Sequence, residues 1–231
     1  MKIVDIHSHT NFSNCGRDKP EELILEMIKQ GVEVLGISDH NHGVLDRDEE
    51  YQKSIRKLGE KYKDQIQILC GLEICTHEPY NMRVGKIPVG YDYCLIENLD
   101  NPVSIMRGDI LSYVEKFPCP IGIAHTDIFA FIEKNGLDAE RYLKSLVARN
   151  IFWELNVSYD SIHGYREHEY VKEFMKNPVQ QELVKRTGLM LSVGFDGHRK
   201  EDYAVDRVRS ANEFIRKNGF PHAIDYILSK K

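Results

Sequence analysis

The stretch Lys2-Ile3-Val4-Asp5-Ile6-His7-Ser8-His9 runs a short apolar segment, typical of a β-strand, into a pair of histidines. Residues two apart on a strand point to the same face, so His7 and His9 can bind one metal ion together. The same spacing recurs near the other end of the chain, in Asp196-Gly197-His198. Between these pairs, further metal-binding residue types follow directly after short apolar runs: His40, Glu73 and His125. This repetition predicts a site for more than one metal ion.

Outward from this stretch, apolar and amphipathic segments alternate along the whole chain. Short runs rich in Ile, Val, Leu or aromatic residues predict seven strands, at 2–7, 34–38, 66–74, 93–96, 120–124, 152–156 and 189–195. Helical patterns lie between them, at 20–30, 47–62, 104–117, 138–149, 167–187 (broken at Pro178) and 203–217. Strand and helix in alternation predict parallel strands in a barrel or an open sheet. We expect one α/β domain over residues 1–231.

The candidate site residues share one position in this pattern. In α/β barrels, the chemistry lies at the carboxyl ends of the strands. The residues at or just after such ends are His9, His40, Glu73, His125, Asn156, Asp196 and His198. The loop expected over 77–90 follows Glu73 and is predicted to shape the entrance to the site. The sequence therefore predicts that these side chains lie together at the carboxyl ends of the strands.

Composition excludes several classes of function. The net charge is −5, and no extended basic stripe offers contacts to the phosphates of long nucleic acids. No apolar run approaches the length of a membrane span, and the N-terminus lacks the pattern of a signal peptide. The five cysteines are unevenly spaced and include no Cys-x-x-Cys pair, which argues against a disulfide framework. We expect a cytoplasmic protein that contacts neither membranes nor long nucleic acids.

The types of candidate ligand indicate the chemistry. Imidazoles and carboxylates favour Zn²⁺, Mn²⁺ or iron in a catalytic setting. Glu73 has two oxygens and can bridge two ions, as in hydrolytic sites whose metals lie roughly 3.5 to 4 Å apart. Two or three divalent ions would bind a phosphoryl group and lower the pKa of a bound water, so that hydroxide is available near neutral pH. The predicted reaction is phosphoester hydrolysis.

The order of the motifs resembles the PHP family, named for polymerase and histidinol phosphatase. The resemblance rests on Asp5-Ile-His-Ser-His-Thr10, Ile37-Ser-Asp-His40, Gly71-Leu-Glu73, Ala124-His125-Thr and Phe195-Asp-Gly-His198. It implies a distorted seven-stranded (β/α)₇ barrel, similar to a TIM barrel, with a metal site at the carboxyl ends of the strands. It also implies an enzyme that hydrolyses phosphoesters.

The resemblance further implies a set of ligands. One ion would be held by His7, His9, Glu73 and Asp196, a second by Glu73 and His125, and a third by His40 with His198. Asp39 would stand beside His40, either to orient it or to handle a proton. Arg17 and Arg199 are candidates for binding the substrate's phosphate, and Asn156 for a polar contact in the site; the alternatives are solvated loop arginines and a residue that forms a turn.

The chain departs from the family pattern at two places. Asn14-Cys15 stands where a His or Asp is usual, and Glu97-Asn98-Leu99 stands where a His follows the fourth strand. The third ion would then use Cys15 or solvent, and the second would use Glu97 or bind weakly. Of these residues, we expect Cys15 to be a passive thiol. Two ions are the smallest number that the motifs support, and three are compatible with them.

These features favour a metal-dependent phosphoesterase that hydrolyses a small phosphomonoester, with histidinol phosphate as one candidate substrate. A nuclease or nucleotide phosphatase is the second hypothesis. A barrel that binds metal but has lost activity is the third, because of the two departures from the pattern.

Overall fold

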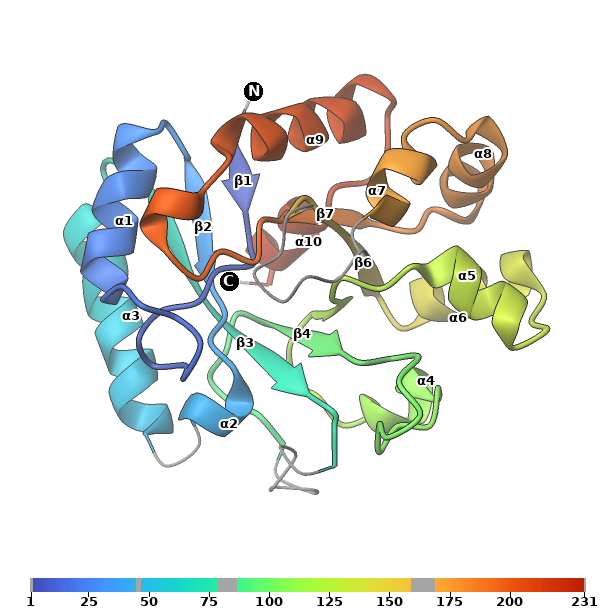
Figure 1. The fold of residues 1–231 in the computed structure, drawn as a ribbon, viewed down its shortest axis with the longest axis horizontal. Helices are drawn as coiled ribbons and strands as arrows, with labels where there is room; N and C mark the ends of the chain where they lie inside the picture. Colours follow the sequence, from blue (N-terminus) through green and yellow to red (C-terminus); the bar gives the residue numbers. More distant parts are fainter. Residues whose placement is uncertain (1, 45–46, 79–86, 159–168, 231) are drawn as a thin grey trace.

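The computed structural model describes residues 2–44, 47–78, 87–158 and 169–230. These residues form seven parallel strands that neighbour one another in chain order, with helices around them (Figure 1). The strands are β1 Val4–Asp5, β2 Val34–Ile37, β3 Gln67–Cys75, β4 Tyr93–Glu97, β5 Ile121–Ile123, β6 Ile151–Asn156 and β7 Leu191–Gly194. All seven predicted strands and the predicted α/β barrel are confirmed.

The first and last strands close the barrel through a few contacts at its edge. The backbone N–H of Ile6 donates to the carbonyl of Val193 at 3.0 Å, and that of Asp196 donates to His7 at 2.8 Å. Ser8 forms a parallel bridge with Gly197 further along. This junction brings the residues that follow β1 beside those that follow β7.

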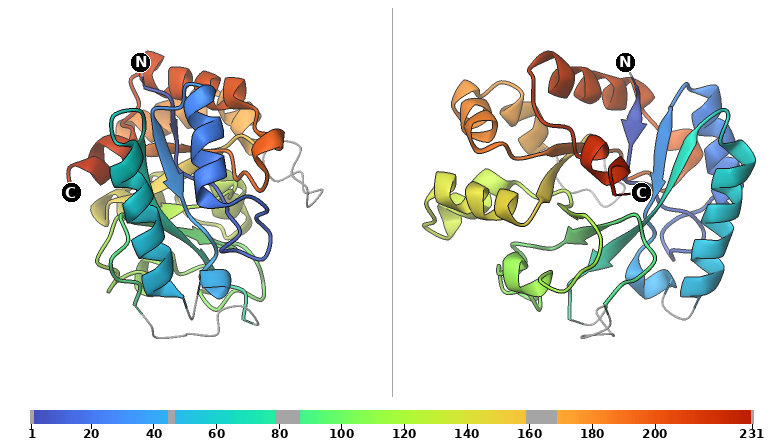
Figure 2. Two further views of the ribbon diagram at one scale, coloured as in Figure 1. Left: turned by 90° about the vertical axis from the view of Figure 1, so that its left-hand side faces the viewer. Right: turned by 180° about the vertical axis from the view of Figure 1, so that it is seen from behind.

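The longer helices cover the outer face of the strands (Figures 1 and 2). They are α1 Pro20–Lys29, α3 Asp48–Tyr62, α6 Ala139–Ala148, α8 Pro178–Thr187 and α9 Val205–Lys217. In α1, Pro20 occupies the first turn, where its missing N–H costs nothing, and Leu23, Ile24 and Met27 are buried. Such apolar stripes were visible in the sequence, and these five helices were predicted.

The predicted helix over 104–117 is largely wrong. Only α4, Ile110–Tyr113, is helical there. Arg107 and Gly108 have left-handed φ angles of 49° and 81°, which a continuous helix does not allow. Asp109 then begins the short helix, because its side chain accepts a hydrogen bond from the backbone of Ser112.

Several short helices were not predicted. They are α2 Asn41–Val44, α5 Ile128–Lys134, α10 Ala223–Leu228 and the 3₁₀ turn η1 Lys200–Asp202. Each is too short to show a clear helical period in the sequence. The helix predicted over 167–187 consists of α7, Glu169–Phe174, and α8, with the break before Pro178 as expected. Residues 167–168, and 79–86 of the predicted loop, lie outside the described residues.

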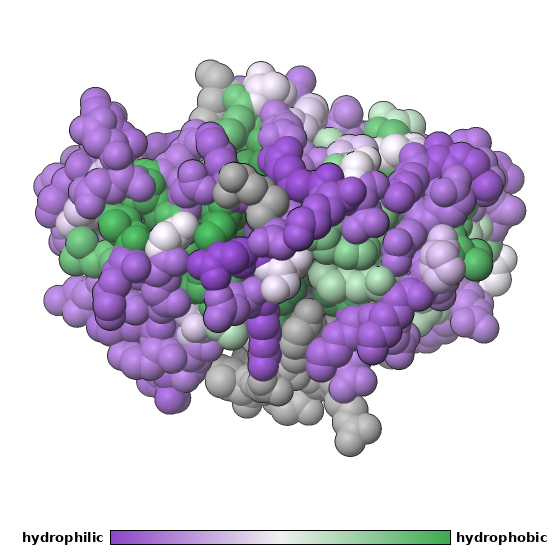
Figure 3. Space-filling model, turned by 90° about the horizontal axis from the view of Figure 1, so that it is seen from above, coloured by the Kyte–Doolittle hydropathy of each residue, from purple (hydrophilic) through white to green (hydrophobic). Residues whose placement is uncertain are grey.

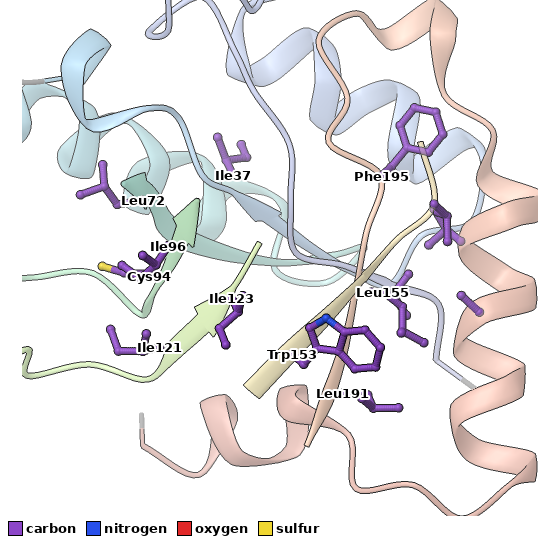
Figure 4. Close-up of a cluster of buried hydrophobic side chains, with 14 of the residues drawn as sticks. Ile37, Leu72, Cys94, Ile96, Ile121, Ile123, Trp153, Leu155, Leu191 and Phe195 are labelled. Carbon is purple, nitrogen blue, oxygen red and sulfur yellow. The ribbon is translucent and has the colours of Figure 1, made fainter. Parts of the chain in front are cut away.

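The main hydrophobic core lies between the strands and the surrounding helices. Trp153 and Leu155 of β6 point into it, beside Leu191 of β7 (Figure 4). Side chains alternate along a strand, so Phe152 and Glu154 face the interior of the barrel instead. The outward positions of β6, which are Ile151, Trp153 and Leu155, are all apolar and hold this strand against the helices.

A second apolar cluster fills the barrel beneath the strand ends. The ring of Tyr93 occupies its middle, and the hydroxyl donates to the carbonyl of Ile6 at 2.5 Å. Gly71 lies against this ring, where a Cβ atom would come within 2.3 Å of Tyr93 Cζ. Ile224 and Ile227 of α10 pack against the same cluster. The interior is therefore filled mainly by apolar side chains below the histidines and carboxylates of the strand ends.

His222 fixes α10 to the rest of the barrel. Its Nδ1 accepts from the backbone N–H of Ile224, so the proton of the neutral ring is on Nε2, which donates to Asn212 Oδ1 at 3.0 Å. Asn212 in turn donates to the carbonyl of Val4 at 2.8 Å. Burial, with a smaller effect from Arg216, lowers the pKa of His222 to about 4; Asp225 acts in the opposite direction.

Hydrophilic residues cover most of the face seen from above, and hydrophobic residues lie in patches between them (Figure 3). In the part of the chain that the structure describes, no helix has both the length and the apolar character needed to cross a membrane.

The contact between Gly71 and Tyr93 predicts a site where even a methyl group is costly. We expect Gly71→Ala to lower the free energy of unfolding by about 1–3 kcal/mol, because the ring has no room to move. Gly59→Ala is the matched control: this glycine lies in α3, where an added Cβ meets Ile68 Cβ at an ordinary 3.5 Å. It should stabilise the protein by up to about 1 kcal/mol. Urea unfolding followed by circular dichroism measures both, and equal stability of Gly71→Ala and the parent would contradict this packing.

The buried neutral ring of His222 predicts a dependence of stability on pH. Its folded pKa lies below the usual 6.5, so the unfolded chain takes up a proton first as the pH falls. This group should therefore cost the protein about 2 kcal/mol of stability between pH 7 and pH 5. His222→Asn retains a cap for α10 but cannot titrate. We would compare urea unfolding of both proteins, with chelator present, at the two pH values; an identical loss of stability would show that His222 does not contribute.

Candidate metal centre

Glu73 lies at the centre of a group of histidines at the carboxyl end of the barrel. It is the inward-facing residue near the end of β3, and it is fully buried. Its two carboxylate oxygens lie between 2.9 and 3.2 Å from ring nitrogens of His7, His9, His40 and His125. Residues spread over much of the chain therefore meet at one carboxylate.

The first group of side chains comes from both edges of the barrel junction. The Nε2 atoms of His7 and His9 face each other at 3.2 Å. Asp196, which follows β7, places Oδ1 at 3.0 Å from His9 Nε2 and 3.5 Å from His7 Nε2. With Glu73, these are the four residues predicted to bind one ion, and the structure brings all four together.

The second group lies on the side of β4 and β5. His125 Nε2 is 2.9 Å from Glu73 Oε1. Glu97, at the end of β4, places Oε2 at 3.9 Å from His125 Nε2 and Oε1 at 3.6 Å from His40 Nδ1. Burial, and next the charge of Glu73, raise the pKa of Glu97 to about 7. Glu97 therefore takes the position where the sequence lacks the expected histidine.

The third group contains His40 and His198, as predicted, and also His9 and Cys15. One ligand atom from each of these four residues lies within 4.8 Å of the other three. The ring of His9 stacks on His40 and on His198, with centroid distances of 4.6 Å in both cases. His42, which the sequence left as a loop residue, extends the stack at 4.7 Å from His40.

Two of the gathered residues adopt left-handed backbone conformations. The φ angle is +23° at His125 and +56° at Asp196. Such conformations are unfavourable for residues other than glycine, by roughly 1 kcal/mol or more, and tend to occur at functional sites. In these conformations His125 approaches Glu73, and Asp196 approaches His7 and His9.

Glu154 on β6 supports the site and was missed in the sequence. It is buried, and His7 Nδ1 donates to its Oε1 at 2.7 Å while the backbone N–H of His125 donates to its Oε2 at 2.7 Å. Gly194 makes room for it, because a Cβ there would lie 1.9 Å from Glu154 Oε1. The available signal was an acidic residue two positions before Asn156, within an otherwise apolar strand.

Asp39 holds the loop that follows His9. Its Oδ1 accepts from the backbone and hydroxyl of Ser13, at 3.1 and 2.6 Å, and from the backbone of Thr10 at 2.7 Å. Its Oδ2 accepts from the Thr10 hydroxyl at 2.6 Å. The backbone N–H of His40 donates to Ser13 Oγ at 2.8 Å, which links Asp39 to His40 through the loop. These contacts favour a role in orientation over one in proton transfer.

The three residues predicted to contact substrate occupy different environments. Asn156 is buried; its amide nitrogen donates to Glu154 Oε2 at 3.3 Å and its oxygen accepts from the backbone of Ser158 at 3.1 Å. Arg17 and Arg199 are exposed, and the Arg17 backbone donates to the carbonyl of His198 at 3.0 Å. Contact with substrate stays a prediction for all three residues.

The pKa values reflect the mutual dependence of these groups. Burial lowers the pKa of His9, but the carboxylates of Asp196 and Glu73 close to the ring outweigh it and raise the pKa to about 9. The same balance, through Glu73, raises the pKa of His125 to about 10. Burial would raise the pKa of Glu73, but His7 and His40 hold it well below its usual value. Protons on the rings of His9 and His125 thus balance the buried carboxylates, and bound cations would replace these protons.

The donor atoms fit divalent metal ions. Among the described residues, the buried Nδ1 of His9 and Oε2 of Glu73 have no hydrogen-bond partner. That oxygen nevertheless lies 3.0 Å from His40 Nδ1, so lone pairs converge without a proton aligned between them. Imidazole and carboxylate donors in this arrangement suit Zn²⁺, Mn²⁺ or iron.

The chain matches one known protein family over most of its length. The sequence model of the PHP domain matches residues 5–220. A search of curated protein sequences found no match.

Two solved structures share the fold. A crystal structure of histidinol phosphate phosphatase (HISK) from Lactococcus lactis subsp. lactis Il1403, complexed with zinc, L-histidinol and phosphate, is 19% identical, with a TM-score of 0.64 over 96% of this chain and 95% of that one. A putative histidinol phosphatase (hisK) from Listeria monocytogenes is 16% identical, with a TM-score of 0.55 over 87% of this chain and 97% of that one. At these identities, the likeness establishes the fold alone.

The contacts of Glu154 predict that it positions His7 and His125. Glu154→Gln keeps the size of the side chain, but its NH₂ group cannot accept a hydrogen bond, so one of the two donors loses its partner. We expect zinc affinity to fall about 10- to 100-fold while the barrel stays folded. Competition with a chromophoric chelator measures this, with the exposed Glu182→Gln as the control. Unchanged affinity in Glu154→Gln would remove Glu154 from the metal centre.

Proposed function

Because the chain belongs to the PHP domain family, we propose that it is a metal-dependent phosphoesterase that hydrolyses a small phosphomonoester. The observation that carries this proposal is the convergence of four histidine rings on the carboxylate of Glu73, with Asp196 beside them. Buried carboxylates without a lysine or arginine nearby are costly, and here each ion pair described for Glu73 and Asp196 is with a histidine. Divalent cations would stabilise this arrangement.

We assign the ligands in three groups. His7, His9, Glu73 and Asp196 would hold one ion, and Glu73, Glu97 and His125 a second. His40 and His198 would hold a third ion. When bound, such ions polarise a phosphoryl group and supply a nucleophilic hydroxide near neutral pH. Zinc, manganese and iron all match the donors of the first two groups.

The protein's own residues would prepare the site for this chemistry. Glu154 fixes the ring of His7 through Nδ1, which directs Nε2 toward Glu73 and Asp196. Asp39 holds the loop between His9 and Cys15. Arg17 and Arg199 are exposed, and they would pair with the phosphate oxygens of a bound substrate. The side chains of His40 and His125 are 15% and 18% exposed, so a small phosphate ester has access to the centre.

Histidinol phosphate is the first substrate to test. Both structural neighbours are named as histidinol phosphatases, and one was crystallised with L-histidinol and phosphate. The net charge of −5 is unfavourable for long polyanions, which ranks a nuclease below a phosphatase of small metabolites. The five free cysteines are consistent with a reducing compartment such as the cytoplasm.

The decisive experiment joins metal analysis with substrate selection. The purified protein would be analysed by inductively coupled plasma mass spectrometry, then assayed with Zn²⁺ or Mn²⁺ on phosphorylated metabolites, histidinol phosphate among them, and on oligonucleotides. We expect at least two ions per chain and release of phosphate from a monoester. Efficient cleavage of oligonucleotides with little action on monoesters would favour a nuclease. Bound metal without activity on any substrate would favour a barrel that binds metal but has lost its activity.

Replacement of Asp196 tests the ligand assignment. Asp196→Ala removes a carboxylate that approaches both His7 and His9. We expect the metal affinity and the rate of phosphate release each to fall at least about 100-fold. The matched control is Asp206→Ala, whose carboxylate on α9 is 93% exposed. Circular dichroism would establish that both variants are folded. Full metal content and full activity in Asp196→Ala would contradict the assignment.

A further inference from the structure

We propose that Cys15 is a metal ligand, and that its thiolate joins His40 and His198, beside the ring of His9, in a site that prefers zinc. This inference rests on the proposed function, since it concerns a further ion at the same centre. It replaces the expectation of a passive thiol, because the sulfur lies with three imidazoles instead of among apolar neighbours.

The set of donor atoms is the first argument. The Cys15 sulfur and one nitrogen from each of the three histidines all lie within 4.8 Å of one another. His9 is a ligand of the first ion in the proposed set, which leaves His40, His198 and Cys15 as donors here. Three protein donors with one position left for solvent or substrate are typical of catalytic zinc sites.

The loop that carries Cys15 is the second argument, because it is held in place by many contacts. Asp39 accepts four hydrogen bonds from Thr10 and Ser13. Gly16 then passes so close to the loop's start that a Cβ there would lie 2.1 Å from the Thr10 carbonyl oxygen. Beyond it, the backbone of Arg17 donates to the carbonyl of His198 at 3.0 Å. Both flanks of Cys15 are thus tied to the strand ends that carry the histidines.

The chemistry of the thiol is the third argument. Cys15 is partly buried, and it shares its group with imidazoles, which are also ligands of zinc. The Zn–S bond would form as the thiol proton leaves to solvent.

This assignment separates two kinds of site within one centre. Glu97 and Glu73 offer oxygen donors beside His125, which accommodate manganese as well as zinc. The group with Cys15 offers nitrogen and sulfur, and thiolates favour zinc over manganese. Dialysis of the zinc-loaded protein against excess Mn²⁺ should therefore leave about one zinc per chain, and Cys15→Ser should lose it.

The direct test uses Co²⁺ as a spectroscopic probe of sulfur ligation. The metal-free parent, Cys15→Ser and Cys119→Ser would be titrated with Co²⁺, and cobalt per chain measured by mass spectrometry. Cys119 is a half-buried cysteine beside Cys94 on the outer side of the barrel, so it controls for the loss of a thiol. We expect a near-ultraviolet thiolate-to-cobalt charge-transfer band in the parent and in Cys119→Ser, and its loss in Cys15→Ser.

Alkylation of the unmutated protein provides a second readout that needs no variant. Peptide mass spectrometry should show that Zn²⁺ largely blocks the reaction of Cys15 with iodoacetamide, while Cys119 reacts as it does without metal. If the parent binds metal but shows no charge-transfer band and no protection of Cys15, the thiolate ligand is disproved and the phosphoesterase proposal stands. If the parent binds no metal at all, both proposals fail.

Discussion

A fully buried carboxylate requires positive charge or hydrogen-bond donors close by, and Glu73 meets this requirement with four histidines from three other segments of the chain. The barrel is what brings these segments together. Seven parallel strands end at the same face, and the contacts of β1 with β7 place His9 beside Asp196. The left-handed backbone at Asp196 and the close packing of Gly194 against Glu154 both serve this one convergence.

The strands and the long helices could be predicted because burial leaves a periodic trace in the sequence. Trp153 and Leu155 alternate with inward residues, and Leu23, Ile24 and Met27 form a stripe on α1. The predicted helix over 104–117 failed because two left-handed residues, Arg107 and Gly108, interrupt it, and apolar spacing does not reveal backbone conformation. The short helix α10 depends on the hydrogen bonds of His222 and on packing against the interior cluster. Both are contacts between distant segments, which a local sequence pattern does not reveal.

For the candidate centre, the sequence pointed to the residues at strand ends and to Asp39, but it missed Glu154. The structure brings His7, Glu73, His125 and Asp196 together, as expected from their positions after apolar runs. Glu154 lies within a strand, where only its charge marked it, and its partners His7 and His125 come from distant segments. The meeting of Cys15 with His9, His40 and His198 likewise depends on how the loop folds back, which Asp39 and Gly16 determine.

The junction of β1 with β7 also has a consequence for biosynthesis. His7 and His9 leave the ribosome well before Asp196 and His198, which follow about 190 residues later. While the rest of the barrel is made, the nascent chain therefore carries these imidazoles without the carboxylate that completes their set. High-affinity metal capture has to wait for the last strand, so the acquisition of metal reports that the whole barrel has been made and closed.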